Sequence, residues 1–97
     1  MLTFIARMKV KEGKEQEFIE LVTELTEKVL ANEPDTKIYQ FYRLRDVERS
    51  FAVIESFTSE AAEKAHLETP YFNDIVPGIT ECLDGTYTRE YLDPLAS

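Results

Sequence analysis

The feature that most constrains the fold of this chain is a change in hydrophobic period, from about 2 to about 3.6, near residue 14. In residues 2–10 apolar and other side chains partly alternate, which is typical of a β-strand. In residues 14–31 the apolar positions recur at helical spacing; they are Phe18, Leu21, Val22, Leu25 and Val29. The chain therefore begins with a strand and a strongly amphipathic helix, and the apolar stripe of that helix needs a sheet to pack against.

Two segments rich in aromatic and β-branched residues follow, and they predict a hairpin. They span residues 37–45 and 50–57, and the charged residues 46–49 connect them. Pro34 disfavours helix at the residue before it, so the first helix should end just ahead of this hairpin.

The second half of the chain carries helix-start signals and one more strand. Thr58 or Ser59 can cap a helix that extends to about Leu67. Thr69 followed by Pro70 favours a new helix start, because proline at the first helical position loses no hydrogen bond. We expect Pro77-Gly78 to kink or divide that helix and residues 86–92 to form the last strand.

The resulting order predicts an α+β fold of the ferredoxin-like β-α-β-β-α-β type, with a four-stranded antiparallel sheet. The 97 residues suit a single domain over residues 1–97, with its core at about 2–92. Both helical regions would cover one face of the sheet. Large bare apolar patches are rare on monomers, so the other face predicts a homodimer.

Charge and composition exclude several classes of partner. Acidic residues outnumber basic ones by 19 to 11, and the net charge is −8. This argues against nucleic acid and against anionic membrane surfaces, which both require clustered Lys and Arg. Cys82 is the only cysteine, so no intrachain disulfide can form. Without a signal-peptide pattern or an apolar run of about 20 residues, we expect a cytoplasmic protein.

His66 is the only histidine and the main candidate for chemistry. Its ordinary pKa lies near neutrality, so it can act as a general acid, a general base or a ligand. Glu55 could orient it if both side chains point inward. The alternative is a structural role, in which His66 sits at a rim and hydrogen-bonds a carboxylate or a carbonyl.

Aromatic residues and two arginines could complete a small-molecule site. Tyr39, Phe41, Tyr71 and Phe72 could line a pocket for a planar ligand, although core and dimer contacts are the alternative. Mid-strand arginines, if buried, would need an anionic partner or ligand; they are Arg7 and Arg43. Surface exposure, or pairing at the dimer contact, is the alternative for both.

The chain offers no recognisable metal or cofactor motif. One histidine and scattered carboxylates lack the spacing of a metal site. The glycines are only Gly13, Gly78 and Gly85, so neither a phosphate loop nor a dinucleotide fingerprint is present. We expect no metal and no cofactor.

Four segments resemble the antibiotic biosynthesis monooxygenase superfamily. They are Phe4–Gly13, Tyr39–Arg45, Val53–Phe57 and Ala65–Phe72, the last being the most specific. The resemblance implies a ferredoxin-like fold that pairs into a dimeric α+β barrel, with a pocket between the sheet and the helices of each subunit. It also implies cofactor-independent oxidation of dihydroxyaromatic compounds to quinones by molecular oxygen.

On this chain the resemblance makes His66 the base, oriented by Glu55, with Tyr71 and Phe72 as aromatic walls. Haem-degrading members carry Asn, Trp and an axial His where this chain has Ala6, His66 and Val76, so haem chemistry is not implied.

We therefore expect a small homodimeric oxidoreductase that acts on a small aromatic or quinol-like compound. Two alternatives stay open. One is an isomerase of a small carbonyl or sugar-phosphate compound, which would need Arg7 or Arg43 in the pocket. The other is a small-molecule-binding module without turnover.

Overall fold

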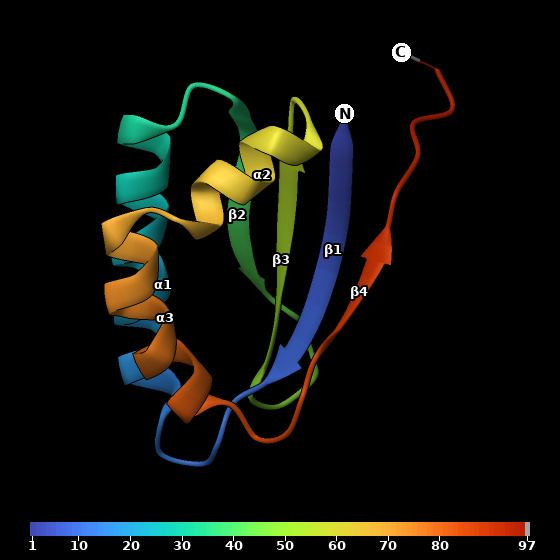
Figure 1. Ribbon diagram of the computed structural model, residues 1–97. Coiled ribbons are helices and arrows are strands. Elements are labelled where there is room, and N and C mark those ends of the chain that lie inside the picture. The colour runs from blue at the N-terminus through green and yellow to red at the C-terminus, as the bar shows by residue number, and fades with distance from the viewer. Residues whose placement is uncertain (97) are drawn as a thin grey trace.

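The computed structural model describes residues 1–96, in the element order β-α-β-β-α-α-β (Figure 1). The elements are β1 (Leu2–Lys9), α1 (Glu15–Asn32), β2 (Thr36–Arg43), β3 (Ser50–Phe57), α2 (Glu60–Leu67), α3 (Pro70–Cys82) and β4 (Thr88–Tyr91). The four strands form an antiparallel sheet in the order β2-β3-β1-β4. The predicted ferredoxin-like fold is confirmed, with the second helical region present as two helices.

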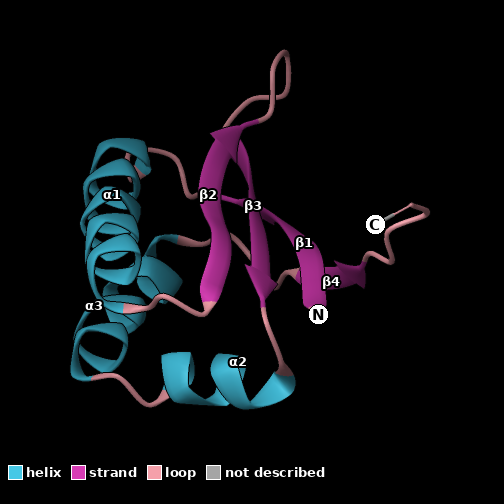
Figure 2. Ribbon diagram, turned by 90° about the horizontal axis from the view of Figure 1, so that it is seen from above, coloured by secondary structure: helices cyan, strands magenta, loops and turns pink. Residues whose placement is uncertain are grey.

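The helices lie on one side of the sheet and leave the other side bare (Figure 2). Phe18, Val22, Leu25 and Val29 of α1 are buried, as its helical spacing predicts. The ring of Phe18 packs against that of Phe51 on β3, with 4.7 Å between ring centroids. The apolar stripe of α1 and the inner face of the sheet thus share one core, which fixes the helix layer over the strands.

Side-chain caps set the beginnings of the two later helices. Ser59 accepts a hydrogen bond from the backbone N–H of Ala62 at 3.1 Å and begins α2. Thr69 accepts one from the N–H of Phe72 at 3.3 Å and begins α3. A turn at residues 68–69 separates the two helices, so the chain changes direction just after the last turn of α2.

Pro77 does not divide the last helix, since α3 continues from Pro70 to Cys82. A proline inside a helix leaves unpaired the carbonyl four residues earlier, here that of Asn73. Asn73 and Pro77 are both exposed, so water can satisfy that carbonyl. Gly78 packs closely against Leu21 of α1, where an added Cβ would lie 3.1 Å from a methyl carbon.

The last strand is shorter than residues 86–92, because only Thr88–Tyr91 pair with β1. This pairing places Arg89 opposite Ala6 and Tyr91 opposite Phe4 on the inner face of the sheet. None of the helices in residues 1–96 is long and apolar enough to cross a membrane.

Candidate functional site

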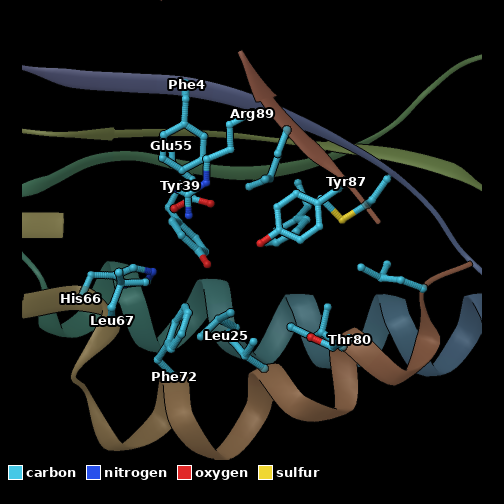
Figure 3. Close-up of a pocket in the computed structure, with 17 residues that line it drawn as sticks. Phe4, Leu25, Tyr39, Glu55, His66, Leu67, Phe72, Thr80, Tyr87 and Arg89 are labelled. Carbon is cyan, nitrogen blue, oxygen red and sulfur yellow. The ribbon is translucent and has the colours of Figure 1, made fainter. Parts of the chain in front are cut away.

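A cavity lies between the inner face of the sheet and the helices (Figure 3). The cavity volume that water-sized spheres can reach is about 80 Å³. At roughly 10–15 Å³ for each such sphere, this is room for about six of them, or one small ring. Most of the lining is apolar, and its polar side chains are Tyr39, Glu55, His66, Thr80, Tyr87 and Arg89. A few polar groups in an apolar cavity are typical of a small-molecule site.

His66 enters this cavity from the last turn of α2 and is held in place by Glu33. Its side chain is only 1% exposed, and its Nδ1 lies 3.0 Å and 3.1 Å from the two carboxylate oxygens of Glu33. Glu33 directly follows α1 as its C-terminal cap. Glu33 also accepts hydrogen bonds from Thr36 Oγ1, at 2.8 Å, and from the hydroxyl of Tyr71.

These contacts determine which nitrogen of His66 carries the proton. An ionised carboxylate only accepts hydrogen bonds, so Nδ1 must be the donor toward Glu33. In the neutral ring, Nε2 is then a bare acceptor. This Nε2 is buried and has no hydrogen-bond partner within residues 1–96. Figure 3 shows His66 at one end of the cavity with a ring nitrogen directed inward, so the geometry is that of an oriented proton acceptor.

Aromatic rings fix the imidazole on its remaining sides. The ring centroids of Tyr39, Phe57 and Phe72 lie 5.1, 5.3 and 4.9 Å from that of His66. Burial raises the pKa of the Tyr39 hydroxyl, and the charges of Glu55 and Glu33 raise it further. Tyr39 therefore remains a neutral phenol beside the imidazole and adds no charge to the cavity.

Glu55 does not orient His66, contrary to the sequence-based expectation. It enters the cavity from β3, on the sheet side, whereas the carboxylate bonded to His66 belongs to Glu33. Burial raises the pKa of Glu55 to about 8, with Glu63 and Glu33 adding to the rise and Arg89 opposing it. At pH 7 the Glu55 side chain is therefore mainly a neutral carboxylic acid.

Arg89 and Tyr87 belong to the cavity, and sequence reasoning missed both. Arg89 Nη1 lies 2.8 Å from Glu63 Oε2, and its guanidinium stacks over the ring of Phe4, 4.2 Å from the centroid. Tyr87 precedes β4 and lies at the other end of the cavity from His66 (Figure 3). Strand alternation was the available signal for Arg89, since it faces the same way as its cross-strand neighbour Ala6.

The other predicted site residues divide into two groups. Tyr39, Phe41 and Phe72 line the cavity, as expected for pocket walls. Tyr71 lies outside this lining, and its hydroxyl binds Glu33 beside a separate hollow. Burial, together with the hydrogen bond to Glu33, raises the pKa of Tyr71 to about 12. Adjacent helical residues point about 100° apart, which is why Phe72 reaches the cavity and Tyr71 does not.

Neither predicted arginine reaches the cavity. Arg43 is 55% exposed, pairs with Glu15 at 3.2 Å and lies over the ring of Phe51, beyond the cavity. Arg7 is 54% exposed and pairs with Glu90 on the outer face of the sheet. A strand arginine is costly to bury without a partner, and both side chains find carboxylates at the surface instead.

Two further candidates carry no site. Cys82 is fully buried, and burial raises the pKa of its thiol, which keeps it protonated and unreactive. In the described part of the chain, no group of three or more His, Cys, Asp or Glu side chains is placed to hold a metal ion.

Comparison with known proteins finds one family over most of the chain. The family model for antibiotic biosynthesis monooxygenase matches residues 1–78. The structure of a candidate antibiotic biosynthesis monooxygenase from Caulobacter crescentus has a TM-score of 0.91 and 33% identity, covering 98% of this chain and 90% of that one. A conserved protein from Methanosarcina mazei has a TM-score of 0.86 and 26% identity, covering 94% and 89%.

One curated relative is longer than this chain. An uncharacterized protein from Synechocystis is 36% identical over 69 residues, which are 71% of this chain and 46% of that protein. The chain thus matches about half the length of this relative.

Proposed function

The chain belongs to the antibiotic biosynthesis monooxygenase family, and on this premise we propose that it is a cofactor-independent monooxygenase of a small aromatic or quinol-type compound. The observation that carries the proposal is the Glu33–His66 pair, which leaves the buried Nε2 free in an apolar cavity. A hydroxyl group of the substrate would lie against this nitrogen and lose its proton to it. Ionisation makes the ring electron-rich, which is the condition for direct reaction with molecular oxygen.

The overall reaction balances without a separate reductant. A dihydroxyarene supplies four electrons, two in forming the quinone and two in replacing a ring C–H by C–OH. Molecular oxygen accepts all four; one of its atoms enters the ring and the other leaves as water. The protein contributes a proton acceptor, a fixed orientation of the ring and exclusion of bulk water.

The charges around the cavity favour a neutral or weakly acidic ligand over a phosphate ester. Arg89 is the cation at the cavity, and its guanidinium pairs with Glu63. A phosphate near Arg89 would also lie near Glu55. The two negative charges would repel each other if Glu55 were ionised. Because Arg7 and Arg43 lie at the surface, the isomerase alternative would have to use Arg89, whose guanidinium is paired with Glu63.

Oxygen uptake with a panel of dihydroxybenzenes and dihydroxynaphthalenes tests the proposal. We expect turnover by the wild type and a loss of about 10²–10⁴-fold in His66→Ala, the usual contribution of a positioned base. Lys64→Ala, an exposed change on the same helix, is the matched control and should keep full activity. Equal rates for wild type, His66→Ala and a blank would contradict the proposal. Saturable binding without product would favour the binding-module alternative.

We further propose that two copies pair through the bare face of the sheet. This face carries Ile5 and Ile54 side by side on β1 and β3, with Ile38 and Tyr42 of β2 43% and 48% exposed. No helix of the described chain covers it (Figure 2). An exposed apolar sheet face suits a twofold homodimer, in which the same surface of both copies forms the contact.

Sedimentation at micromolar concentration tests this pairing. The wild type should have the mass of two chains, and Ile54→Lys should shift it to one, because a charge would be buried at the centre of the contact. Leu30→Lys is the control, since Leu30 is 59% exposed on α1, away from this face. A wild type that sediments as one chain would contradict the dimer.

A further inference from the structure

Glu55 occupies a position for which the base mechanism gives no use. It lies in the middle of the sheet, between Phe4 on β1 and Tyr39 on β2, and all three face the helices. The residues around it in the cavity are mainly apolar. Burying a carboxyl group among such side chains costs free energy unless a hydrogen bond or a charge offsets its desolvation. A hydrogen-bond partner for Glu55 would offset this cost.

No side chain within residues 1–96 supplies that partner. Glu55 makes neither a hydrogen bond nor an ion pair there, although Arg89 stands nearby on β4 (Figure 3). Arg89 instead binds Glu63 of α2 and stacks over Phe4, so its guanidinium is already paired with another carboxylate. The carboxyl of Glu55 thus remains available to a molecule in the cavity.

The groups facing Glu55 determine its protonation state. The titratable or charged residues that line the cavity with Glu55 are Tyr39, His66, Tyr87 and Arg89, and the charges of Glu63 and Glu33 also act on it. Burial is the largest influence and raises the pKa of Glu55 to about 8; two of the three charged neighbours that act on it are acidic. Near pH 7 the group therefore retains a proton that it can donate.

We propose that Glu55 is a second ligand-contacting group, whose carboxylic acid donates a hydrogen bond to an oxygen atom of the bound aromatic compound. This inference rests on the proposed function and narrows its substrate class. His66 accepts a proton from one hydroxyl of the ring, and Glu55 approaches from the sheet side, toward a second oxygen substituent. The preferred ligand is therefore a one-ring compound with an acidic hydroxyl and a separate oxygen that can accept a hydrogen bond.

Two phenols of nearly the same shape test this selectivity by binding alone. 4-Methoxyphenol has a hydroxyl for His66 and an ether oxygen for Glu55, whereas 4-ethylphenol has the hydroxyl but no second oxygen. Dissociation constants are measured by titration calorimetry at pH 7 and pH 9 for the wild type, Glu55→Gln and Glu55→Leu. Circular dichroism confirms that each variant is folded.

The expected pattern has three parts. The wild type prefers the methoxy compound by about fivefold to tenfold at pH 7, the usual contribution of one hydrogen bond. It loses this preference at pH 9, because the ionised carboxylate has no hydrogen to donate. Glu55→Gln keeps the preference at both pH values through its amide N–H, and Glu55→Leu lacks it at both.

Each contrary result has one meaning. A wild-type preference that persists unchanged in Glu55→Leu, or that does not fall at pH 9, would overturn the role of Glu55. If both phenols bind equally and His66→Ala abolishes binding, the Glu55 inference fails while the proposed function stands. If neither phenol binds the wild type, the inference is overturned together with the proposal that the cavity binds phenols.

Discussion

The two walls of the cavity hold their titratable groups in different ways. On the helix side, His66 is fixed through Nδ1 by Glu33, which is itself held by Thr36 and Tyr71. On the sheet side, Glu55 is fixed only by its strand and has no hydrogen-bond partner in the described chain. A network thus places a proton acceptor on one wall, whereas burial, assisted by the charges of Glu63 and Glu33, maintains a proton donor on the other.

This difference shows how one small cavity can hold an acid and a base at the same pH. A hydrogen-bond network sets the tautomer and orientation of an imidazole, which needs a direction. A carboxyl that must keep its proton needs an apolar surround and few nearby cations. Changes to the helix side should therefore affect the direction of proton transfer, and changes to the sheet side should affect pH dependence.

The largest effect is expected from Glu33→Gln on the helix side. The amide N–H of glutamine can donate to Nδ1 of His66, which moves the ring proton to Nε2 and removes the base. We expect turnover to fall by about 10²–10⁴-fold. The measurement is kcat for the substrate identified by oxygen uptake. An unchanged kcat would show that the Glu33 carboxylate is not needed to orient His66 on the helix side.

The next effect concerns stability on the sheet side, tested with Glu55→Gln. The pKa of Glu55 rises from 4.5 to about 8 in the folded chain, so the folded state keeps a proton that the unfolded state loses between these values. Wild-type stability contributed by this group is therefore full below about pH 4.5 and is lost as pH rises toward 8. Glutamine does not titrate.

We expect the free energy of unfolding, wild type minus Glu55→Gln, to fall by about 4 kcal/mol between pH 5 and pH 8.5. Urea unfolding at the two pH values measures it. Glu60→Gln, at an exposed position of α2, is the control and should show little pH dependence. A difference that stays constant or rises with pH would refute a neutral Glu55.

A smaller effect is expected from Tyr71→Phe, which weakens the network without touching the cavity lining. Loss of the hydroxyl donor to Glu33 should reduce stability by about 1–2 kcal/mol. Because the pKa of Tyr71 is raised to about 12, this loss should be the same from pH 6 to pH 9. Thermal unfolding checks it, with Thr23→Val, which removes an exposed hydroxyl on α1, as the control. Equal melting temperatures for both variants would remove Tyr71 from the network.

The smallest effect is expected from Arg89→Met. The Arg89–Glu63 pair is partly exposed, so its loss should cost no more than about 1 kcal/mol. Because Arg89 opposes the rise in the pKa of Glu55, its removal should move that pKa above about 8. Carboxyl carbon-13 NMR measures the titration midpoint, and Arg89→Lys should keep it near the wild-type value. A lower titration midpoint in Arg89→Met would contradict the effect of Arg89 on the pKa of Glu55.

The sequence was sufficient for the fold because period and caps are local signals. The helical spacing in residues 14–31 and the aromatic strands 37–45 and 50–57 correspond to α1, β2 and β3. A division of the helix at Pro77 was wrong, because a proline tolerated on an exposed helix face looks identical in sequence to one that breaks a helix.

The site was only partly predictable because its contacts are tertiary. His66 and Phe72 were identified from one short segment, and both line the cavity. Glu33 lies 33 residues before His66, in a helix-ending turn, where an acidic residue is unremarkable by local pattern. Glu55 was noticed as a carboxylate near His66, but which carboxylate bonds the ring depends on how α1 and α2 pack together.

The proposed function depends on Glu33, which keeps the proton of His66 on Nδ1 and leaves Nε2 bare toward the cavity. Because the chain has a single histidine, nitrogen-15 labelling of histidine gives one ring spin system to assign. At neutral pH we expect a protonated Nδ1 and an unprotonated Nε2 in the long-range proton–nitrogen spectrum, with the reverse in Glu33→Gln. A wild-type spectrum with the proton on Nε2, or with the averaged shifts of a free imidazole, would contradict it.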